Sequence, residues 1–283
     1  MERRLGIVLY VCALMSCLAP AAGAIVPQPS AGCSAATIEK GRPLQRAIEV
    51  DGLQRNYLLD VPDQLSPQIP VPLLFDFHGF GHSAAGVWQV SQFRDLAARD
   101  GFITVYPDGL PVHLLGRDAP GWEIFTVDGN RDVALTRRLL DHLEQTYCID
   151  RARIYVTGFS NGAFFSNLLG CVMADRFAAI APVSGGRITV SCTPPRGVPV
   201  ILHHGRKDER IDVTQGRQAR DAWVQMNHCT GHSDGECEVY RECRDGATVE
   251  YCEDDGVHYW PVAATQRIWE FFRAHPMTQA HGN

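Results

Sequence analysis

The stretch RIYVTGFSNGAFFSNLLGCVM, residues 153–173, contains the pattern that decides the fold. Arg153–Thr157 is apolar like a buried strand, and Ala163–Met173 has the composition of a helix. Between them, Gly158-Phe-Ser160-Asn-Gly162 matches G-x-S-x-G, in which the serine occupies a sharp strand-to-helix turn with its hydroxyl exposed. Glycines on either side let neighbouring backbone approach without a Cβ clash. A glycine-rich turn is the plain alternative, but the flanking strand and helix favour Ser160 as a nucleophile.

A serine nucleophile needs a base, and the base needs an acid that orients it. After this motif the acid and then the histidine follow along the chain. Asp208 comes soon after the strand-like run Val198–His203, and Asp212 is its nearest rival. His258 lies in a later loop, residues 255–261. We therefore expect Ser160, Asp208 and His258 to form a catalytic triad.

Two backbone N–H groups are candidates for an oxyanion hole. Asn161 follows the serine, so its N–H would lie at the start of the helix. The second donor is expected from the loop after the third strand, where His78-Gly-Phe-Gly81 follows an apolar run. The glycines there would let the N–H of Phe80 turn toward a substrate. We therefore expect Phe80 and Asn161 to hold the oxyanion.

Short apolar runs alternate with helix-like segments along the rest of the chain. The order indicates a mostly parallel sheet with helices on both faces, an α/β fold. His203 and His204, which precede Asp208, are expected to pack at a strand end. Expected strands are Asn56–Val61, Val71–Phe77, Phe102–Tyr106, Arg153–Thr157, Ala178–Val183 and Val198–His203, and expected helices are Phe93–Arg99, Val133–Tyr147, Ala163–Met173, Gly216–Asn227 and Thr265–His275.

The N-terminus has the features of an export signal. Arg3 and Arg4 supply positive charge, Ile7–Leu18 is apolar, and residues 22–24 provide the small residues of a cleavage site. The apolar run is shorter than the roughly 20 residues that a membrane span requires. We expect a signal peptide at residues 1–24 and a secreted protein, extracellular or, in a bacterium, periplasmic. After signal removal we expect no membrane contact.

Composition excludes several other classes of protein. The 283 residues are 45% hydrophobic and 20% charged, which excludes a wholly disordered chain. The formal net charge is −6 and no Lys/Arg run occurs, so we expect no binding to nucleic acid. No repeat or linker divides the chain. We expect a leader at residues 25–40, one catalytic domain at 41–276 and a tail at 277–283, in a monomer.

Eight of the ten cysteines remain once Cys12 and Cys17 leave with the signal. An even number in an exported protein indicates disulfides, here up to four. No C-x-x-C pair or H-E-x-x-H motif occurs, so we expect no metal site. Residues 228–256 are polar, acidic and contain four of the cysteines. We expect them to form a disulfide-stapled excursion from the domain.

Taken together, these motifs resemble the secreted polyhydroxybutyrate depolymerase and feruloyl esterase group of α/β-hydrolases, close to carbohydrate esterase family 1. The resemblance runs from about Arg55 to His275 and implies an α/β-hydrolase fold with the triad already chosen. It rests on Arg55–Pro62, Phe77–Gly79, Val105–Gly109, Asp132-Val133, Tyr147–Asp150, Gly158–Gly162, Asp175–Gly185, His204–Gly205 with Asp208, and His258–Pro261.

The resemblance implies a serine esterase without metal or organic cofactor. Its first implied substrates are feruloyl esters of plant cell-wall polysaccharide, followed by hydroxyalkanoate polyesters and acetylated xylan. A peptidase on this scaffold and a non-catalytic binding protein are the alternatives, and the intact triad argues against the second. Trp122, Tyr259 and Trp260 are candidates for an aromatic wall around the acid part of the ester, with a buried core role an equal alternative for Trp122.

The same resemblance bears on the cysteines. Fungal-type feruloyl esterases similar to this sequence have counterparts of six of the eight, and Cys237 and Cys252 are additional. The resemblance therefore implies that Cys237 pairs with Cys252 and that Cys229 pairs with Cys243.

Overall fold

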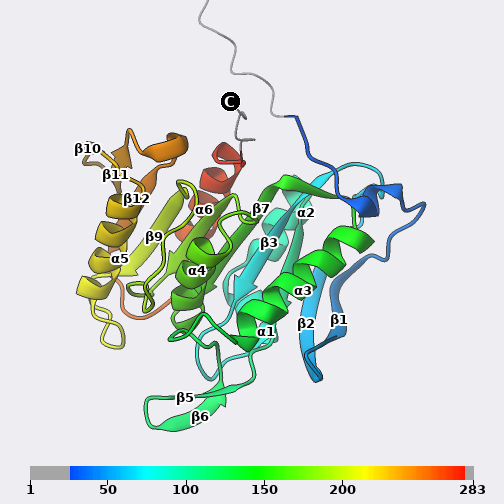
Figure 1. The fold of residues 1–283 in the computed structure, drawn as a ribbon, viewed down its shortest axis with the longest axis horizontal. Helices are drawn as coiled ribbons and strands as arrows, with labels where there is room; N and C mark the ends of the chain where they lie inside the picture. Colours follow the sequence, from blue (N-terminus) through cyan, green and yellow to red (C-terminus); the bar gives the residue numbers. More distant parts are fainter. Residues whose placement is uncertain (1–25, 278–283) are drawn as a thin grey trace, which may run out of the picture.

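The computed structural model describes residues 26–277 (Figure 1). The predicted signal peptide, and the predicted tail beyond residue 277, lie outside the described residues. Within them, ten strands form one sheet in the order β1-β2-β4-β3-β7-β8-β9-β12-β11-β10, and β5 and β6 form a separate hairpin. The strands are β1 Gly41–Val50, β2 Leu53–Val61, β3 Val71–Phe77, β4 Ile103–Pro107, β5 Pro111–Leu114, β6 Arg117–Pro120, β7 Ile149–Phe159, β8 Ala179–Val183, β9 Val200–Gly205, β10 Gly231–Ser233, β11 Glu238–Arg241 and β12 Val249–Asp254.

The centre of the sheet is parallel, as the sequence predicts. Neighbouring strands from β4 through β3, β7, β8 and β9 to β12 all pair in parallel. All residues of β3, β4, β8 and β9 are buried, because helices cover both faces and leave no side in water. Parallel strands end at a common edge, and their carboxyl ends present the loops that carry the predicted site residues.

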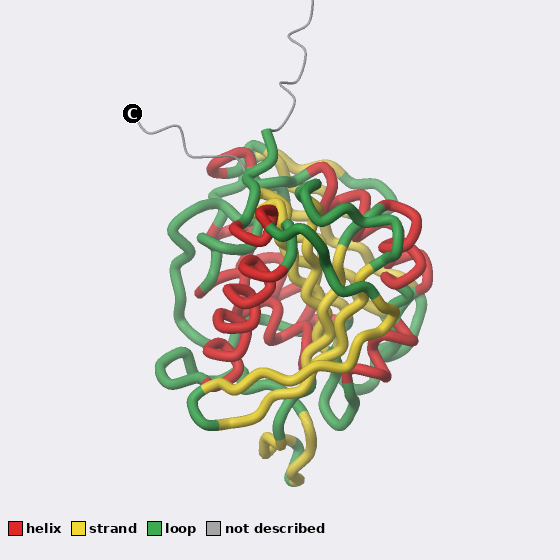
Figure 2. The backbone as a smooth tube through the Cα atoms, turned by 90° about the vertical axis from the view of Figure 1, so that its right-hand side faces the viewer, coloured by secondary structure: helices red, strands yellow, loops and turns green. Residues whose placement is uncertain are grey.

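Helices cover both faces of the sheet, which confirms the predicted fold class. α3, α4 and α5 pack on one face, and α1, α2 and α6 pack on the other (Figures 1 and 2). The helices are α1 Ala84–Val90, α2 Phe93–Asp100, α3 Arg131–Thr146, α4 Asn161–Val172, α5 Val213–Met226 and α6 Val262–Ala274, with short 3-10 turns η1 Ala31–Ser34 and η2 Arg244–Gly246.

The cysteine-dense segment differs from the expectation in one respect. β10 and β11 do form an added antiparallel hairpin at the end of the sheet. β12, however, pairs in parallel with β9 and belongs to the centre of the fold, so residues 249–254 were wrongly included in the excursion. Their sequence, VEYCED, is too polar to indicate a buried strand, because burial is mainly confined to its first four residues.

Four disulfides connect the eight cysteines of the described chain. The pairs Cys229–Cys243 and Cys237–Cys252 confirm the pairing that the resemblance implies. The other two pairs are Cys33–Cys148 and Cys171–Cys192. The Cys237–Cys252 bridge joins the segment just before β11 to β12, so it attaches the added hairpin to the central sheet.

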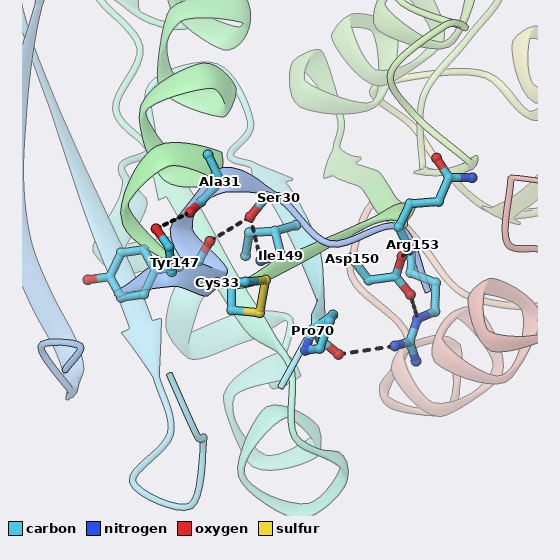
Figure 3. The surroundings of a disulfide bond; sticks show 11 residues. Ser30, Ala31, Cys33, Pro70, Tyr147, Ile149, Asp150 and Arg153 are labelled. Carbon is cyan, nitrogen blue, oxygen red and sulfur yellow. Dashed lines mark hydrogen bonds and ion pairs between the residues drawn. A yellow bond between two sulfur atoms is a disulfide. The ribbon is translucent and has the colours of Figure 1, made fainter. Parts of the chain in front are cut away.

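The segment before β1 is bound to the domain around Cys33–Cys148 (Figure 3). The Ser30 hydroxyl donates to the Tyr147 carbonyl over 2.8 Å and accepts from the Ile149 N–H over 2.9 Å. The Gln28 N–H donates to the Asp150 carboxylate over 2.8 Å. These contacts place the leader against the start of β7, the strand that Ser160 follows.

Candidate active site

Ser160 occupies the strained turn that the motif predicts. It follows β7 directly and caps α4 with φ 55° and ψ −117°, a conformation that costs a non-glycine residue about 1–3 kcal/mol. The Ser160 N–H donates to the Val183 carbonyl of β8 over 3.0 Å. A Cβ at Gly162 would lie 2.1 Å from the Phe77 carbonyl oxygen, and one at Gly158 would lie 2.5 Å from the Gly162 carbonyl oxygen. The two glycines therefore allow backbone segments to pack closely enough to hold the strain.

Asp208 and His258, which are 50 residues apart in the chain, lie in contact. Nδ1 of His258 lies 2.7 Å from Oδ2 of Asp208, a carboxylate with no exposed side-chain area. Oδ1 of Asp208 accepts the N–H groups of Arg210 and Ile211, each over 2.9 Å. The rival Asp212 instead caps α5, where its carboxylate accepts the Thr214 N–H over 2.9 Å. The structure thus distinguishes the two aspartates by what each one binds.

Backbone contacts hold the loops of the acid and the histidine together. After β9 and β12, the Arg206 N–H donates to the Asp254 carbonyl over 2.8 Å, and the Lys207 N–H donates to the Gly256 carbonyl over 2.9 Å. The Ser184 hydroxyl, after β8, donates to the Tyr259 carbonyl over 3.1 Å. These bonds fix the position of the loop that carries His258 relative to the sheet.

The histidine also contacts the elbow, the strand-to-helix turn of residues 158–162 that contains Ser160. The His258 ring packs against the ring of Phe159, the residue before the nucleophile, with centroids 4.8 Å apart. Ser160, Asp208 and His258 follow β7, β9 and β12 at the common edge of the sheet. That edge is where ligands bind in open α/β sheets.

The two predicted oxyanion donors flank this turn. A Cβ at Gly79 would lie 3.3 Å from the Cβ of Ser160, so the loop that contains Phe80 runs against the nucleophile. Asn161 is the first residue of α4, and its N–H has no acceptor within the helix. The Gly81 N–H donates to the Pro120 carbonyl over 2.7 Å, and the Arg117 guanidinium lies 4.7 Å from the Phe80 ring centroid. The β5–β6 hairpin therefore supports the Phe80 loop.

His78 stabilises the conformation of the loop that contains Phe80. The sequence identifies this histidine only as part of that loop. Nδ1 lies 2.8 Å from the Gly79 carbonyl, and Nε2 accepts the Gly109 N–H over 2.9 Å. Nδ1 must then carry the proton, because a carbonyl can only accept. Burial lowers the pKa of His78, which favours this neutral form. The ring links the loop after β3 to the loop after β4.

The three predicted aromatic residues have different surroundings. Trp122 is fully buried, stacks on Phe165 and donates its Nε1 proton to the His78 carbonyl over 2.8 Å. Trp260 is 5% exposed and donates to the Thr265 hydroxyl over 2.8 Å. Tyr259 is 39% exposed, and its hydroxyl donates to Asp254 over 2.9 Å. Both tryptophans pack within the protein, so of the three only Tyr259 offers substantial surface to a ligand.

Asn161 contributes a side-chain contact that sequence reasoning missed. Its Oδ1 accepts the Trp122 N–H over 2.8 Å, and its Nδ2 donates to the Trp122 carbonyl over 3.2 Å. The backbone at Trp122 is thereby bound to the first turn of α4. Within residues 26–277, no three His, Cys, Asp or Glu side chains lie close enough together to ligate one metal ion.

Comparison with known proteins gives a consistent result. A family model described as phospholipase/carboxylesterase matches residues 71–242. The chain is 29% identical over 233 residues to feruloyl esterase B of Piromyces equi, an alignment that covers 71% of this chain and 42% of that protein. It is 27% identical over 274 residues to feruloyl esterase D of Neurospora crassa, covering 86% and 90%. The chain therefore spans less than half the length of the Piromyces protein.

A solved structure supports the fold. The acetyl xylan esterase from Aspergillus awamori is similar with a TM-score of 0.66 at 15% sequence identity, over 82% of this chain and 99% of that one. At this identity the likeness concerns the fold alone. It confirms the expected α/β-hydrolase architecture.

Proposed function

Because the chain belongs to the phospholipase/carboxylesterase family of α/β-hydrolases, we propose that it is a secreted serine esterase that hydrolyses feruloyl esters of plant cell-wall polysaccharide. Ser160 is the nucleophile, His258 the base, and Asp208 the acid that orients the histidine. The observation that carries the proposal is the 2.7 Å contact between Asp208 and His258, whose loops share the sheet edge with the strained Ser160 turn.

The proposed reaction proceeds in two steps. His258 takes the hydroxyl proton as Ser160 Oγ attacks the ester carbonyl, and the oxyanion accepts the N–H groups of Phe80 and Asn161. The C–O bond to the alcohol then breaks, and His258 returns the proton to the departing oxygen. Water attacks the acyl-enzyme in the same way and releases the acid. One oxyanion donor contributes about 3–4 kcal/mol to such a reaction.

The choice of substrate rests on the relatives and on a cavity. Two relatives are named feruloyl esterases. A cavity of about 350 Å³ lies between β5 and residues 122–126, and this volume is in the range of small-molecule sites. It is lined in part by Val112, Leu114 and Phe125, apolar side chains suited to a phenylpropenoid ring. Its lining includes Trp122, whose backbone N–H donates to the Asn161 side chain over 2.8 Å.

A comparison of three substrates tests the proposal. Methyl ferulate, acetylated xylan and a 3-hydroxybutyrate oligomer are incubated separately with the wild-type protein and with Ser160→Ala. We expect the highest kcat/KM on methyl ferulate and a rate lower by about 10⁴-fold or more in the variant. A higher rate on either other substrate would replace the substrate class, and no hydrolysis of any ester would favour a binding protein. Retained hydrolysis by Ser160→Ala would exclude the proposed nucleophile.

Secretion belongs to the same proposal. Four disulfides are typical of oxidising compartments outside the cytosol. No helix among residues 26–277 is long and apolar enough to cross a membrane. We propose that the mature protein acts as a monomer without cofactor on an ester carried by a polysaccharide. Sedimentation at several protein concentrations tests the monomer, since a second, faster boundary would contradict it.

A further inference from the structure

A second histidine lies beside the acid of the proposed triad. Nε2 of His204, near the end of β9, is 3.4 Å from Oδ2 of Asp208, the oxygen that also contacts His258. Both side chains are almost completely buried, with 1% and 0% exposed side-chain area. His204 therefore faces the carboxylate on a side that water does not reach. The proposed catalytic steps make no use of it.

The same ring nitrogen holds the turn that contains Asp208. Nε2 of His204 lies 2.8 Å from the carbonyl oxygen of Ile211. Because a carbonyl only accepts, Nε2 carries the proton. Ile211 in turn donates its own N–H to Oδ1 of Asp208 over 2.9 Å. The turn 208–211 is thus fixed at both groups of Ile211, one by the carboxylate and the other by His204.

α5 confines the ring from the other side. A Cβ at Gly216 would lie 2.6 Å from Nδ1 of His204 and 2.9 Å from the Tyr251 hydroxyl. The ring occupies the space between this glycine and Asp208 and has little freedom to rotate. The arrangement holds the N–H edge of His204 toward the turn and toward Oδ2.

We propose that His204 is a positioning residue, which holds Asp208 in the orientation that aligns His258 for proton transfer. It acts by two means: its N–H anchors the Ile211 carbonyl, and the positive edge of the ring faces the carboxylate. This inference rests on the proposed function, because it assigns a role within the proposed triad. His204 touches neither the nucleophile nor, in this arrangement, the substrate.

The neighbouring histidine provides a matched control. His203 is also buried on β9, and alternation along a strand directs its side chain to the opposite face. Its Nε2 has no hydrogen-bond partner among the described residues. Replacing it removes a buried imidazole of the same size from the same strand without changing the turn 208–211.

Steady-state kinetics on p-nitrophenyl acetate test the role. His204→Leu keeps the bulk but removes the N–H, and we expect kcat to fall about 10- to 100-fold, because the Ile211 carbonyl loses its buried donor and Asp208 loses the polar edge that faces it. KM should stay within about twofold, because Asp208 acts on the reaction and not on binding. His204→Gln can place an N–H near Nε2 and should recover most of kcat. His203→Leu should leave kcat within about twofold of wild type.

Gly216→Ala places a methyl group against the His204 ring from α5 without changing any polar group. It is the test variant if His204→Leu does not fold. Its methyl group should displace the ring and lower kcat while KM is kept. Equal kcat for wild type and a folded His204→Leu would overturn the inference, as would a His204→Gln as slow as His204→Leu. Unchanged kcat in Gly216→Ala, if only that variant folds, would do the same. A wild-type protein with no esterase activity would instead contradict the proposed function.

Discussion

The nucleophile and the acid–histidine pair lie at the same edge of the sheet, but different parts of the chain hold them in place. β7, Ser160 and α4 follow one another along the chain, and close backbone approaches at Gly158 and Gly162 fix the turn. Asp208 and His258 are 50 residues apart, and between them lie α5, the β10–β11 hairpin and β12. Two disulfides occur within that interval, Cys229–Cys243 and Cys237–Cys252.

This difference separates local from long-range control of the site. The elbow needs only a strand, a helix and glycines where backbones meet. His258 depends on the pairing of β12 with β9, and thus on a segment whose other side carries a stapled hairpin. Loss of structure in the β10–β11 hairpin should therefore displace His258 more than it displaces Ser160.

The largest expected effect is the loss of the nucleophile. Ser160→Ala should lower kcat by about 10⁴-fold or more, as removal of a triad serine does in other hydrolases. Alanine at position 160 has the same Cβ as serine and adopts the same positive φ with the same strain. The thermal midpoint should therefore change little. The measurement is the initial rate of methyl ferulate hydrolysis beside the unfolding curve of each protein.

Two disulfide variants separate fold stability from site geometry. Replacing Cys33 and Cys148 by Ser opens a link of sequence separation 115, and loop entropy predicts a loss of about 5 kcal/mol. Replacing Cys237 and Cys252 opens a separation of 15 and should cost about 3 kcal/mol. Denaturant unfolding measures both losses.

Activity should follow the opposite order. At low temperature, where both variants are folded, the Cys237/Cys252 variant should lose more kcat, because Cys252 is on the strand that leads to His258. The Cys33/Cys148 variant should keep a kcat near that of wild type. If the Cys33/Cys148 variant lost more kcat than the Cys237/Cys252 variant, the proposed dependence of His258 on the hairpin would be wrong.

A buried carboxyl beside the elbow predicts a pH dependence of stability. Asp76 on β3 is fully buried, and burial raises its pKa to about 7 against the opposing effect of the nearby Ser91 hydroxyl. Between about pH 4 and pH 7 the folded chain keeps a proton that the unfolded chain releases, so stability falls as the pH rises. Asp76→Asn removes this loss and should gain about 4 kcal/mol over wild type at pH 8.

Chemical unfolding at pH 4 and at pH 8 checks that prediction. The two proteins should differ by only about 0.5 kcal/mol at pH 4, because that pH lies close to the ordinary Asp pKa of 3.8 that applies in the unfolded chain. A constant difference between them at both pH values would show that ionisation of Asp76 is not the cause.

The smallest expected effect concerns Asn161. Asn161→Ala removes both side-chain hydrogen bonds to Trp122 but keeps the backbone N–H proposed for the oxyanion hole. We expect a loss of about 1–3 kcal/mol of stability, the cost of leaving buried partners unsatisfied. The activation free energy of the folded enzyme should change by less than the free energy of unfolding. Steady-state kinetics and thermal unfolding of the same samples measure the two changes. A large fall in kcat with unchanged stability would instead assign the side chain to the reaction.

Local patterns account for what the sequence predicted well. The elbow is contiguous, so residues 153–173 contain the strand, the turn and the helix in order. Asp208 was separable from Asp212 by its distance from the preceding strand. The meeting of Asp208 with His258 needed only the rule that parallel strands end at one edge.

Patterns that depend on distant partners were missed. β12 is a core strand with a polar sequence, because its three acidic residues are only partly buried although they pair with β9. β1 alternates buried and exposed positions weakly and pairs with one strand only, so its sequence is not distinctive. The sequence left two roles open for Trp122, and its full burial depends on Phe165 and His78 from other elements. His204 was expected only to pack, since nothing near it in the chain marks its contact with Asp208.

The most direct test of the proposed triad is the site of covalent labelling by a fluorophosphonate, located by mass spectrometry after digestion. Labelling requires a serine activated by its base. We expect one adduct, on Ser160, in the wild-type protein and none at the same exposure in His258→Gln. An adduct on another serine, or equal labelling of Ser160 in the variant, would contradict it.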